Sequence, residues 1–224
     1  KSFIISLGYV FMLHRVGDID QSKLMANENM KVSQKYLDDF LKYIKSRYDI
    51  VRTEEVPFLL NKERNRPFVC FTMDDGYKDN LTEALPVFKK HNVPFTIFLA
   101  SDFMGGNANL WWYALEDLLL NQEGIELSDG SRYFTRTKEE KQDAFMKIRR
   151  VILGLNPLIL EESLNALFSS YNVNWKFRSK ELCLSWAEIE ELKSILASEQ
   201  KVLAIIKEEL LEIKNKYGEE RKTN

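Results

Sequence analysis

Cys70-Phe71-Thr72-Met73-Asp74-Asp75-Gly76-Tyr77 is the stretch that decides how this chain folds. It closes an apolar run, Pro67 to Met73, with two adjacent carboxylates and a glycine. Asp-Gly is also typical of hairpin turns, and an aspartate can cap a helix. A hairpin needs a second alternating strand, whereas the apolar positions after Gly76 recur at helical spacing, at Leu81, Ala84, Leu85 and Phe88. The segment therefore predicts a strand, an acidic turn and a helix.

The position of the two carboxylates favours chemistry over a purely structural role. In α/β folds, catalytic groups gather at the carboxyl ends of strands, where loops direct several side chains to one spot. Neighbouring carboxylates repel each other, so they are commonly held by a cation or divide the roles of metal ligand and base. Asp74 and Asp75 therefore indicate a metal site.

The surrounding sequence alternates between short strands and capped helices. Ser33 precedes an apolar stripe at helical spacing, Tyr48 to Val51 suits a short strand, and Thr53 suits a second capped turn. The run from Pro94 to Ala100 predicts another strand. These βα units predict a partly parallel α/β sheet or barrel.

The character of the sequence changes after residue 104. We expect one domain over 1–224, in which βα units occupy 1–104, a mainly helical insertion occupies 105–184 and an amphipathic helical segment occupies 185–224. The insertion includes a small hairpin from Ile125 to Phe134, turning at Asp129-Gly130. The last segment reads as one long helix, or as two with a break near Ser198.

At five places the chain resembles the polysaccharide deacetylases, the NodB-like carbohydrate esterases, in the subgroup with a helical insertion. Pro67 to Asn80 resembles the family's first motif, usually Thr-Phe-Asp-Asp-Gly, with Met73 at the usual Phe position. The other matching stretches are Phe11 to Val16 with its His-Arg-Val signature, Leu85 to Phe98, Leu110 to Tyr113, and Leu184 to Trp186. The resemblance covers most of the chain in order.

The resemblance implies a hydrolase that removes N-acetyl groups from a polysaccharide with a divalent metal, zinc or cobalt. By position, Asp74 corresponds to the general base and Asp75 to a metal ligand. The residue types suit this chemistry, because a carboxylate can take the proton of a metal-activated water while the cation polarises the amide carbonyl.

The chain departs from the family at the metal ligands. The His-Ser/Thr-x-x-His motif and the carboxyl-terminal motifs are missing, and the two histidines of the chain are His14 and His91. The resemblance thus implies an incomplete NodB-like barrel with impaired or absent activity. The alternatives left open are a non-catalytic carbohydrate-binding relative and a magnesium-dependent enzyme with strand-end aspartates.

Three further residues are candidates for the site. His14 lies at the expected carboxyl end of an early strand and is a candidate second metal ligand, although zinc normally takes three or four protein ligands. Tyr77 and Asp79 are candidates to line the substrate pocket, whereas His91 suits a structural helix end. For Trp111-Trp112, packing of the insertion is favoured over sugar stacking.

Composition adds few constraints. The 224 residues are 45% apolar and 29% charged with a net charge of −2, which gives no bias toward nucleic acid. Cys70 and Cys183 predict free thiols rather than a disulfide framework.

The apolar run from Phe3 to Leu13 reads as a buried strand. No window is long enough for a membrane span, so cytoplasmic and envelope-associated locations stay open. A missing barrel strand would expose a sheet edge, which predicts self-association.

Overall fold

The computed structural model describes residues 8–60, 62–176, 178–198 and 204–207. These residues form two compact units. Unit 1 contains the described residues within 1–18, 31–105 and 182–224, and unit 2 contains residues 19–30 and 106–181. The division at 105 and 182 lies close to the limits expected for the insertion, but the grouping of residues 19–30 with it has no signal in the sequence.

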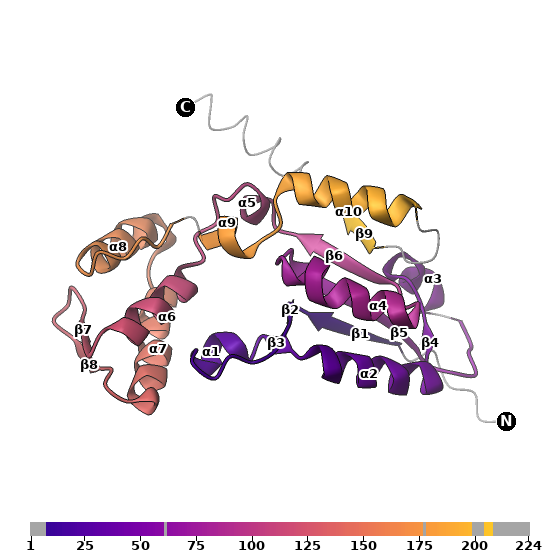
Figure 1. The fold of residues 1–224 in the computed structure, drawn as a ribbon, viewed down its shortest axis with the longest axis horizontal. Coiled ribbons are helices and arrows are strands. Elements are labelled where there is room, and N and C mark those ends of the chain that lie inside the picture. The colour runs from indigo at the N-terminus through magenta and orange to yellow at the C-terminus, as the bar shows by residue number, and fades with distance from the viewer. Residues whose placement is uncertain (1–7, 61, 177, 199–203, 208–224) are drawn as a thin grey trace. The chain divides into compact units, whose positions relative to one another are not determined.

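A parallel sheet forms the centre of unit 1 (Figure 1). Its order is β1 (Gly8–Leu13), β5 (Phe68–Asp75), β6 (Phe95–Leu99) and β9 (Ala204–Lys207), with β4 (Asp49–Ile50) also paired to β5. Every pair in this sheet is parallel. A small parallel pair joins β2 (Arg15–Val16) to β3 (Lys31–Val32). The prediction of a parallel α/β arrangement is confirmed, and the described strands form an open sheet.

Helices α2 (Gln34–Arg47) and α4 (Leu85–His91) pack on this sheet through aromatic side chains. The ring of Phe40 on α2 lies 5.0 Å from that of Phe11, and the ring of Phe88 on α4 lies 5.5 Å from that of Phe71. As predicted, Ser33 caps α2, its side chain accepting the Tyr36 amide at 3.1 Å. Edge-to-face ring pairs thereby fix both helices against β1 and β5.

Short elements complete unit 1. A π-helix, Asn80–Ala84, leads from the acidic turn into α4. A 3₁₀ helix (Thr53–Glu55) and α3 (Val56–Leu59) lie between β4 and β5, and α5 (Ser101–Met104) follows β6. Helices α9 (Arg178–Leu182) and α10 (Trp186–Ser198) precede β9.

The expectation of helix throughout the last segment is wrong for residues 204–207. Helix α10 ends at Ser198, and Ala204–Lys207 is a strand that pairs in parallel with β6, Phe95 opposite Ala204. The β-branched pair Ile205-Ile206 suits a strand, and the edge of β6 offers it unpaired backbone groups. The edge of β6 is therefore covered by β9. The remainder of the segment, 199–203 and 208–224, lies outside the described residues.

Strand β1 is an edge strand with one open face. Val10 and Met12 are 58% and 59% exposed, whereas Phe11 between them packs against Phe71, with ring centroids 5.7 Å apart. The expectation of a buried strand is therefore wrong for β1: among the described elements, helices pack against only one of its faces. The first part of the predicted run, up to residue 7, lies outside the described residues.

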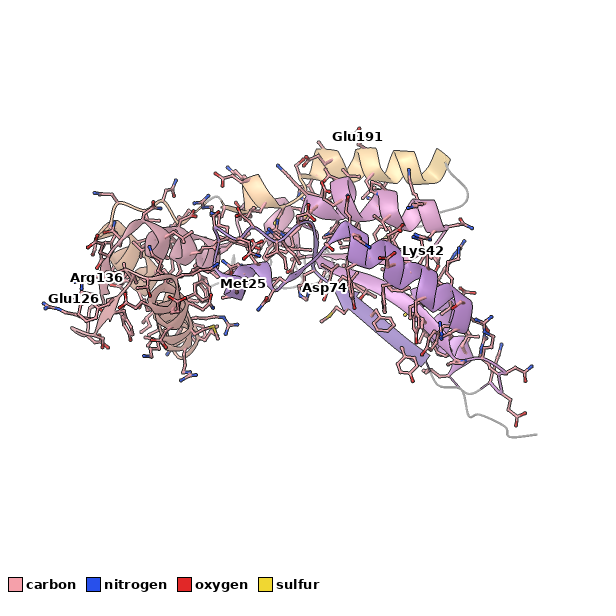
Figure 2. All side chains as sticks on the ribbon, turned by 60° about the horizontal axis from the view of Figure 1, so that its bottom comes forward. Met25, Lys42, Asp74, Glu126, Arg136 and Glu191 are labelled. Atoms are coloured by element: carbon pink, nitrogen blue, oxygen red, sulfur yellow. The ribbon has the colours of Figure 1, made fainter. Side chains whose placement is uncertain are left out.

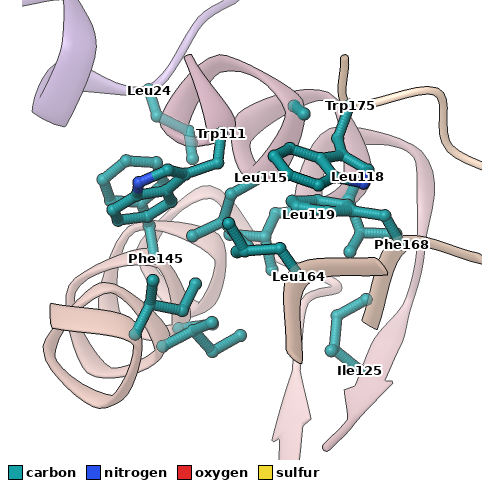
Figure 3. Packing of buried hydrophobic residues seen from close by; sticks show 14 residues of the cluster. Leu24, Trp111, Leu115, Leu118, Leu119, Ile125, Phe145, Leu164, Phe168 and Trp175 are labelled. Atoms are coloured by element: carbon teal, nitrogen blue, oxygen red, sulfur yellow. The ribbon is translucent and has the colours of Figure 1, made fainter. Parts of the chain in front are cut away.

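Unit 2 is mainly helical and has its own core (Figure 3). Its main elements are α1 (Met25–Glu28), α6 (Trp111–Asn121), α7 (Lys138–Leu153), α8 (Pro157–Ser169) and an antiparallel hairpin of β7 (Gly124–Glu126) and β8 (Arg132–Phe134). The hairpin confirms the prediction made from Asp129-Gly130. Trp111 is buried in this core and Trp112 packs against it, so the tryptophan pair serves packing. Within the described chain, no helix combines the length and apolar character that crossing a membrane requires.

Residues 19–30 are fastened to α6 by polar contacts. The backbone amide of Leu24 donates to the Glu116 carboxylate at 2.7 Å, and the Asn27 side chain donates to the Trp112 carbonyl at 3.3 Å. Lys23 pairs with Asp117 at 3.3 Å. Since Leu24 is fully buried and Glu116 is 3% exposed, the contact between them is shielded from water.

Candidate active site at the carboxyl end of the sheet

Strand β5 carries both carboxylates of the acidic turn to the carboxyl end of the sheet (Figure 2 labels Asp74). Asp74 pairs with Phe98 and Asp75 with Leu99 on β6. Asp75 and Gly76 then adopt left-handed backbone angles, with φ of 73° and 75°. A Cβ on Gly76 would lie 2.7 Å from Leu99 Cδ2 and 2.9 Å from Met104 Cε, so the turn requires glycine both for its angles and for its space. The predicted strand and acidic turn are confirmed.

His14 lies beside the acidic turn. Leu13 on β1 pairs with Met73 on β5, so the residue after Leu13 reaches the level of Asp74. Burial raises the pKa of Asp75; the neighbouring imidazole of His14 opposes this rise and the carboxylate of Asp74 adds to it. The structure thus brings together three of the predicted site residues, His14, Asp74 and Asp75.

Asp79 joins β2 to the loop after the acidic turn. Arg15 Nε donates to Asp79 Oδ2 at 2.7 Å, and the Val16 amide donates to Asp79 Oδ1 at 3.3 Å. The Asn80 side chain donates to the His14 carbonyl at 2.9 Å. Burial raises the pKa of Asp79, while the Arg15 guanidinium and the Val16 amide oppose the rise. The side chain of Asp79, 12% exposed, is engaged in pairing rather than presented to a substrate.

Tyr77 is fully buried, so its ring does not line an open surface. The Arg15 guanidinium lies 4.9 Å from the centre of the ring, and the ring of Phe103 lies 6.4 Å away. Tyr77 therefore packs in the interior next to the turn. Its position two residues after Asp75 in the sequence does not predict this burial.

A segment near Cys183, which runs into the stretch Leu184 to Trp186 that resembles the family, borders the turn. Tyr77 and Cys183 form an antiparallel bridge, flanked by hydrogen bonds from Leu184 N to Gly76 O at 2.9 Å and from Lys78 N to Leu182 O at 2.8 Å. Burial, together with the nearby Asp75 carboxylate, raises the pKa of Cys183 to about 12. The thiol is therefore protonated at neutral pH. Both Cys183 and Cys70 are free and buried, as predicted.

These donors do not fit a zinc site. Structural and catalytic zinc sites use three or four protein ligands, and thiols bind zinc as thiolates. Within the described part of the chain, no three His, Cys, Asp or Glu side chains are placed to hold one metal ion. Asp75 has His14 as a neighbour, whereas His91 is bonded to Asp38 on α2. The described residues thus hold the carboxylate pair without a full ligand set.

Comparisons with known proteins find partial matches that include the acidic turn. Residues 61–142 match the family model "Polysaccharide deacetylase". The chain is 25% identical over 107 residues to the putative polysaccharide deacetylase YxkH of Bacillus subtilis (strain 168), a match that covers 46% of this chain and 38% of that protein. It is also 74% identical over 35 residues to a DNA gyrase polypeptide of Clostridium acetobutylicum, which covers 16% of this chain and 4% of the gyrase polypeptide. The chain thus spans well under half the length of either curated relative.

Two solved structures give partial matches. IcaB from Ammonifex degensii is 23% identical with a TM-score of 0.37, over 45% of this chain and 40% of that one. The Streptococcus pyogenes deacetylase PplD, in complex with acetate, is 21% identical with a TM-score of 0.38, over 54% of each chain. These scores are too low to support any argument about the present fold. By the match over residues 61–142 and the Bacillus relative, this chain is similar to the polysaccharide deacetylase family around its acidic turn.

Proposed function

We propose that this chain is a carbohydrate N-deacetylase by descent, whose substrate is an N-acetylated polysaccharide or oligosaccharide. The observation that supports this best is the left-handed turn at Asp75 and Gly76, which holds two carboxylates at a strand end beside His14. In this proposal Asp74 is the general base, and Asp75 with His14 is the remnant of a site for a divalent metal, zinc or cobalt.

We further propose that turnover by this chain is impaired. The supporting observation is the donor set: within the described residues, no three His, Cys, Asp or Glu side chains are placed to hold one metal ion. Fewer than three charged or imidazole ligands bind zinc weakly.

The first test is a calorimetric titration of the full chain with Zn²⁺ and Co²⁺, alongside Asp75→Asn and His14→Ala. We expect weak binding that each substitution abolishes, and no acetate release from N-acetylglucosamine oligomers in the presence of either metal. Tight binding, followed by release of acetate that Asp74→Asn removes, would show a working site and overturn the proposed impairment.

A second candidate is a non-catalytic relative that binds glycans. The same incomplete donor set favours it. Binding of N-acetylglucosamine oligomers that survives Asp74→Asn, without acetate release, would support this candidate. Phosphate release from a phosphomonoester with Mg²⁺ would instead point to the magnesium-dependent alternative.

A further inference from the structure

Unit 2 contains a cavity of about 560 Å³ that the acidic turn does not use. It lies between α7, α8 and the turn of the β7–β8 hairpin. Ile148, Ile152 and Leu164 line it and are at least 95% buried, so its floor is part of the unit's core (Figure 3 labels Leu164). Its volume lies within the range of small-molecule sites, roughly 300–1,000 Å³.

The floor of the cavity is aliphatic, and serines and carboxylates line the remainder. Val151, Leu155 and Leu167 extend the apolar surface of the floor. Tyr171 contributes the one aromatic ring among the described lining residues, and its hydroxyl accepts the Glu126 amide at 2.7 Å. Carbohydrate sites commonly stack sugar rings on aromatic side chains, and Tyr171 is the one aromatic residue among those described here. The apolar surface therefore suits a flexible hydrocarbon chain better than a carbohydrate.

The charge at the cavity is negative. Glu126 and Asp129 line it, and the described lining residues include no lysine, arginine or histidine. Hydrogen bonds from Ser131 lower the pKa of Asp129, so this carboxylate is ionised at neutral pH. Glu126 pairs with Arg132 at 2.6 Å, which leaves Asp129 as the carboxylate better able to meet a ligand charge. A negative rim favours a cationic head group and opposes a carboxylate, sulfate or phosphate.

We infer that the cavity between α7, α8 and the hairpin turn is a binding site for a cationic amphiphile, whose aliphatic chain occupies the floor and whose ammonium head lies near Asp129. This site is independent of the proposed deacetylase chemistry, since its residues belong to unit 2 and the acidic turn belongs to unit 1.

The test is calorimetry on the full chain with three dodecyl compounds below their micelle concentrations: dodecyltrimethylammonium, dodecyl maltoside and dodecyl sulfate. We expect the cation to bind at least about tenfold more tightly than the sulfate, with the uncharged maltoside between them. Tetramethylammonium, which lacks the chain, should not bind. A preference of less than tenfold for the cation over the sulfate would overturn the inference.

Variants locate the site. Ala166 lines the cavity from an exposed position on α8, so Ala166→Trp should fill the space and weaken binding of dodecyltrimethylammonium by at least about tenfold. Glu162→Trp places the same ring on an exposed position of α8 outside the lining and should bind as the unaltered chain does. Asp129→Asn should weaken binding of the cation and leave binding of the maltoside unchanged.

A second variant that fills the cavity keeps the test valid if Ala166→Trp does not fold. Val151 is 41% exposed on α7, and Val151→Trp enters the cavity from the opposite helix. Circular dichroism identifies which of the two variants folds. Unchanged binding in a folded filling variant, or displacement of the amphiphile by N-acetylglucosamine oligomers, would contradict the inference.

Discussion

The imidazole of His91 and the carboxylate of Asp38 lie 2.7 Å apart, Nε2 to Oδ1, and join the end of α4 to α2. Lys90 reaches the same oxygen at 2.7 Å, and Lys42 contacts the other. His91 therefore has the structural role predicted for it. It ends α4 just before Asn92, which takes the left-handed angle, φ 52°, of a helix terminus.

Asp38→Asn should destabilise unit 1 in a pH-dependent way. Hydrogen bonds from Lys42, Lys90 and His91 lower the pKa of Asp38, so its stabilisation is present above the ordinary pKa of an aspartate and is lost as the pH falls. We expect the variant to melt below the unaltered chain at pH 7 and the gap to narrow progressively as the pH falls below about 4. Thermal melts between pH 7 and pH 2 check this, and a gap at pH 2 as large as the gap at pH 7 would contradict it.

Asp75→Asn should stabilise the fold at neutral pH. Burial raises the pKa of Asp75, so ionising this carboxylate costs stability above its ordinary pKa, about 3.9 for an aspartate. Asparagine removes the charge and tolerates the left-handed angle at this position. We expect a higher melting temperature at pH 7 and no difference near pH 3. A lower melting temperature at pH 7 would mean that the carboxylate is stabilised by contacts other than those described.

Arg15 and Asp79 should prove energetically coupled. Their side chains are 14% and 12% exposed, so removing one leaves a charge that water reaches poorly. Arg15→Met should lower the free energy of unfolding by about 2 kcal/mol, Asp79→Asn by less because burial already disfavours this carboxylate, and the double variant by clearly less than the sum. Urea denaturation of the four proteins measures this. Strictly additive effects would indicate that the pair contributes no interaction energy.

Gly76→Ala should cost more than Gly130→Ala. Both glycines have φ near +80°, but an added Cβ meets Leu99 and Met104 at Gly76 and nothing within 4 Å at Gly130. The backbone penalty of about 1–2 kcal/mol applies to both, and the overlap adds about 1–3 kcal/mol at Gly76 alone. Denaturation of the two variants isolates the steric part, and equal costs would show that Leu99 and Met104 move aside freely.

Glu116→Ala should loosen the segment of residues 19–30. The substitution removes the acceptor of the buried Leu24 amide, whereas Glu116→Gln keeps an acceptor oxygen. We expect hydrogen exchange at the Leu24 amide to accelerate about 10- to 100-fold in the alanine variant and to change little in the glutamine variant. Equal hydrogen-exchange protection of the Leu24 amide in the alanine and glutamine variants would mean that side-chain packing, and not this hydrogen bond, holds residues 19–30 in place.

The sequence predicted features that depend on near neighbours. The strand up to Asp75, the helix capped by Ser33 and the hairpin around Gly130 each follow from a periodicity or a turn residue within one short window. The proximity of His14 to Asp75 followed from parallel strands ending at one edge of the sheet. These features needed no information on distant contacts.

Features that depend on distant partners were missed. The contact of Leu24 with Glu116 joins residues 92 positions apart, with no pattern at either end. Ile205 and Ile206 satisfy helical spacing as well as a strand, and only the free edge of β6 decides between the two. The burial of Tyr77 depends on Arg15 and Phe103, which no local window contains.

Both units are discontinuous in the sequence, and this constrains the order in which the chain folds during synthesis. Unit 2 needs residues 19–30 and residues up to 181, while unit 1 begins before residue 19 and uses β9 at 204–207. Domains generally fold as units, with the amino-terminal one first as the ribosome proceeds. Here β1 is made well before its partner β5 at residues 68–75, and Leu24 well before its partner Glu116, so each waits for a later stretch of the chain before it can take its place in the fold.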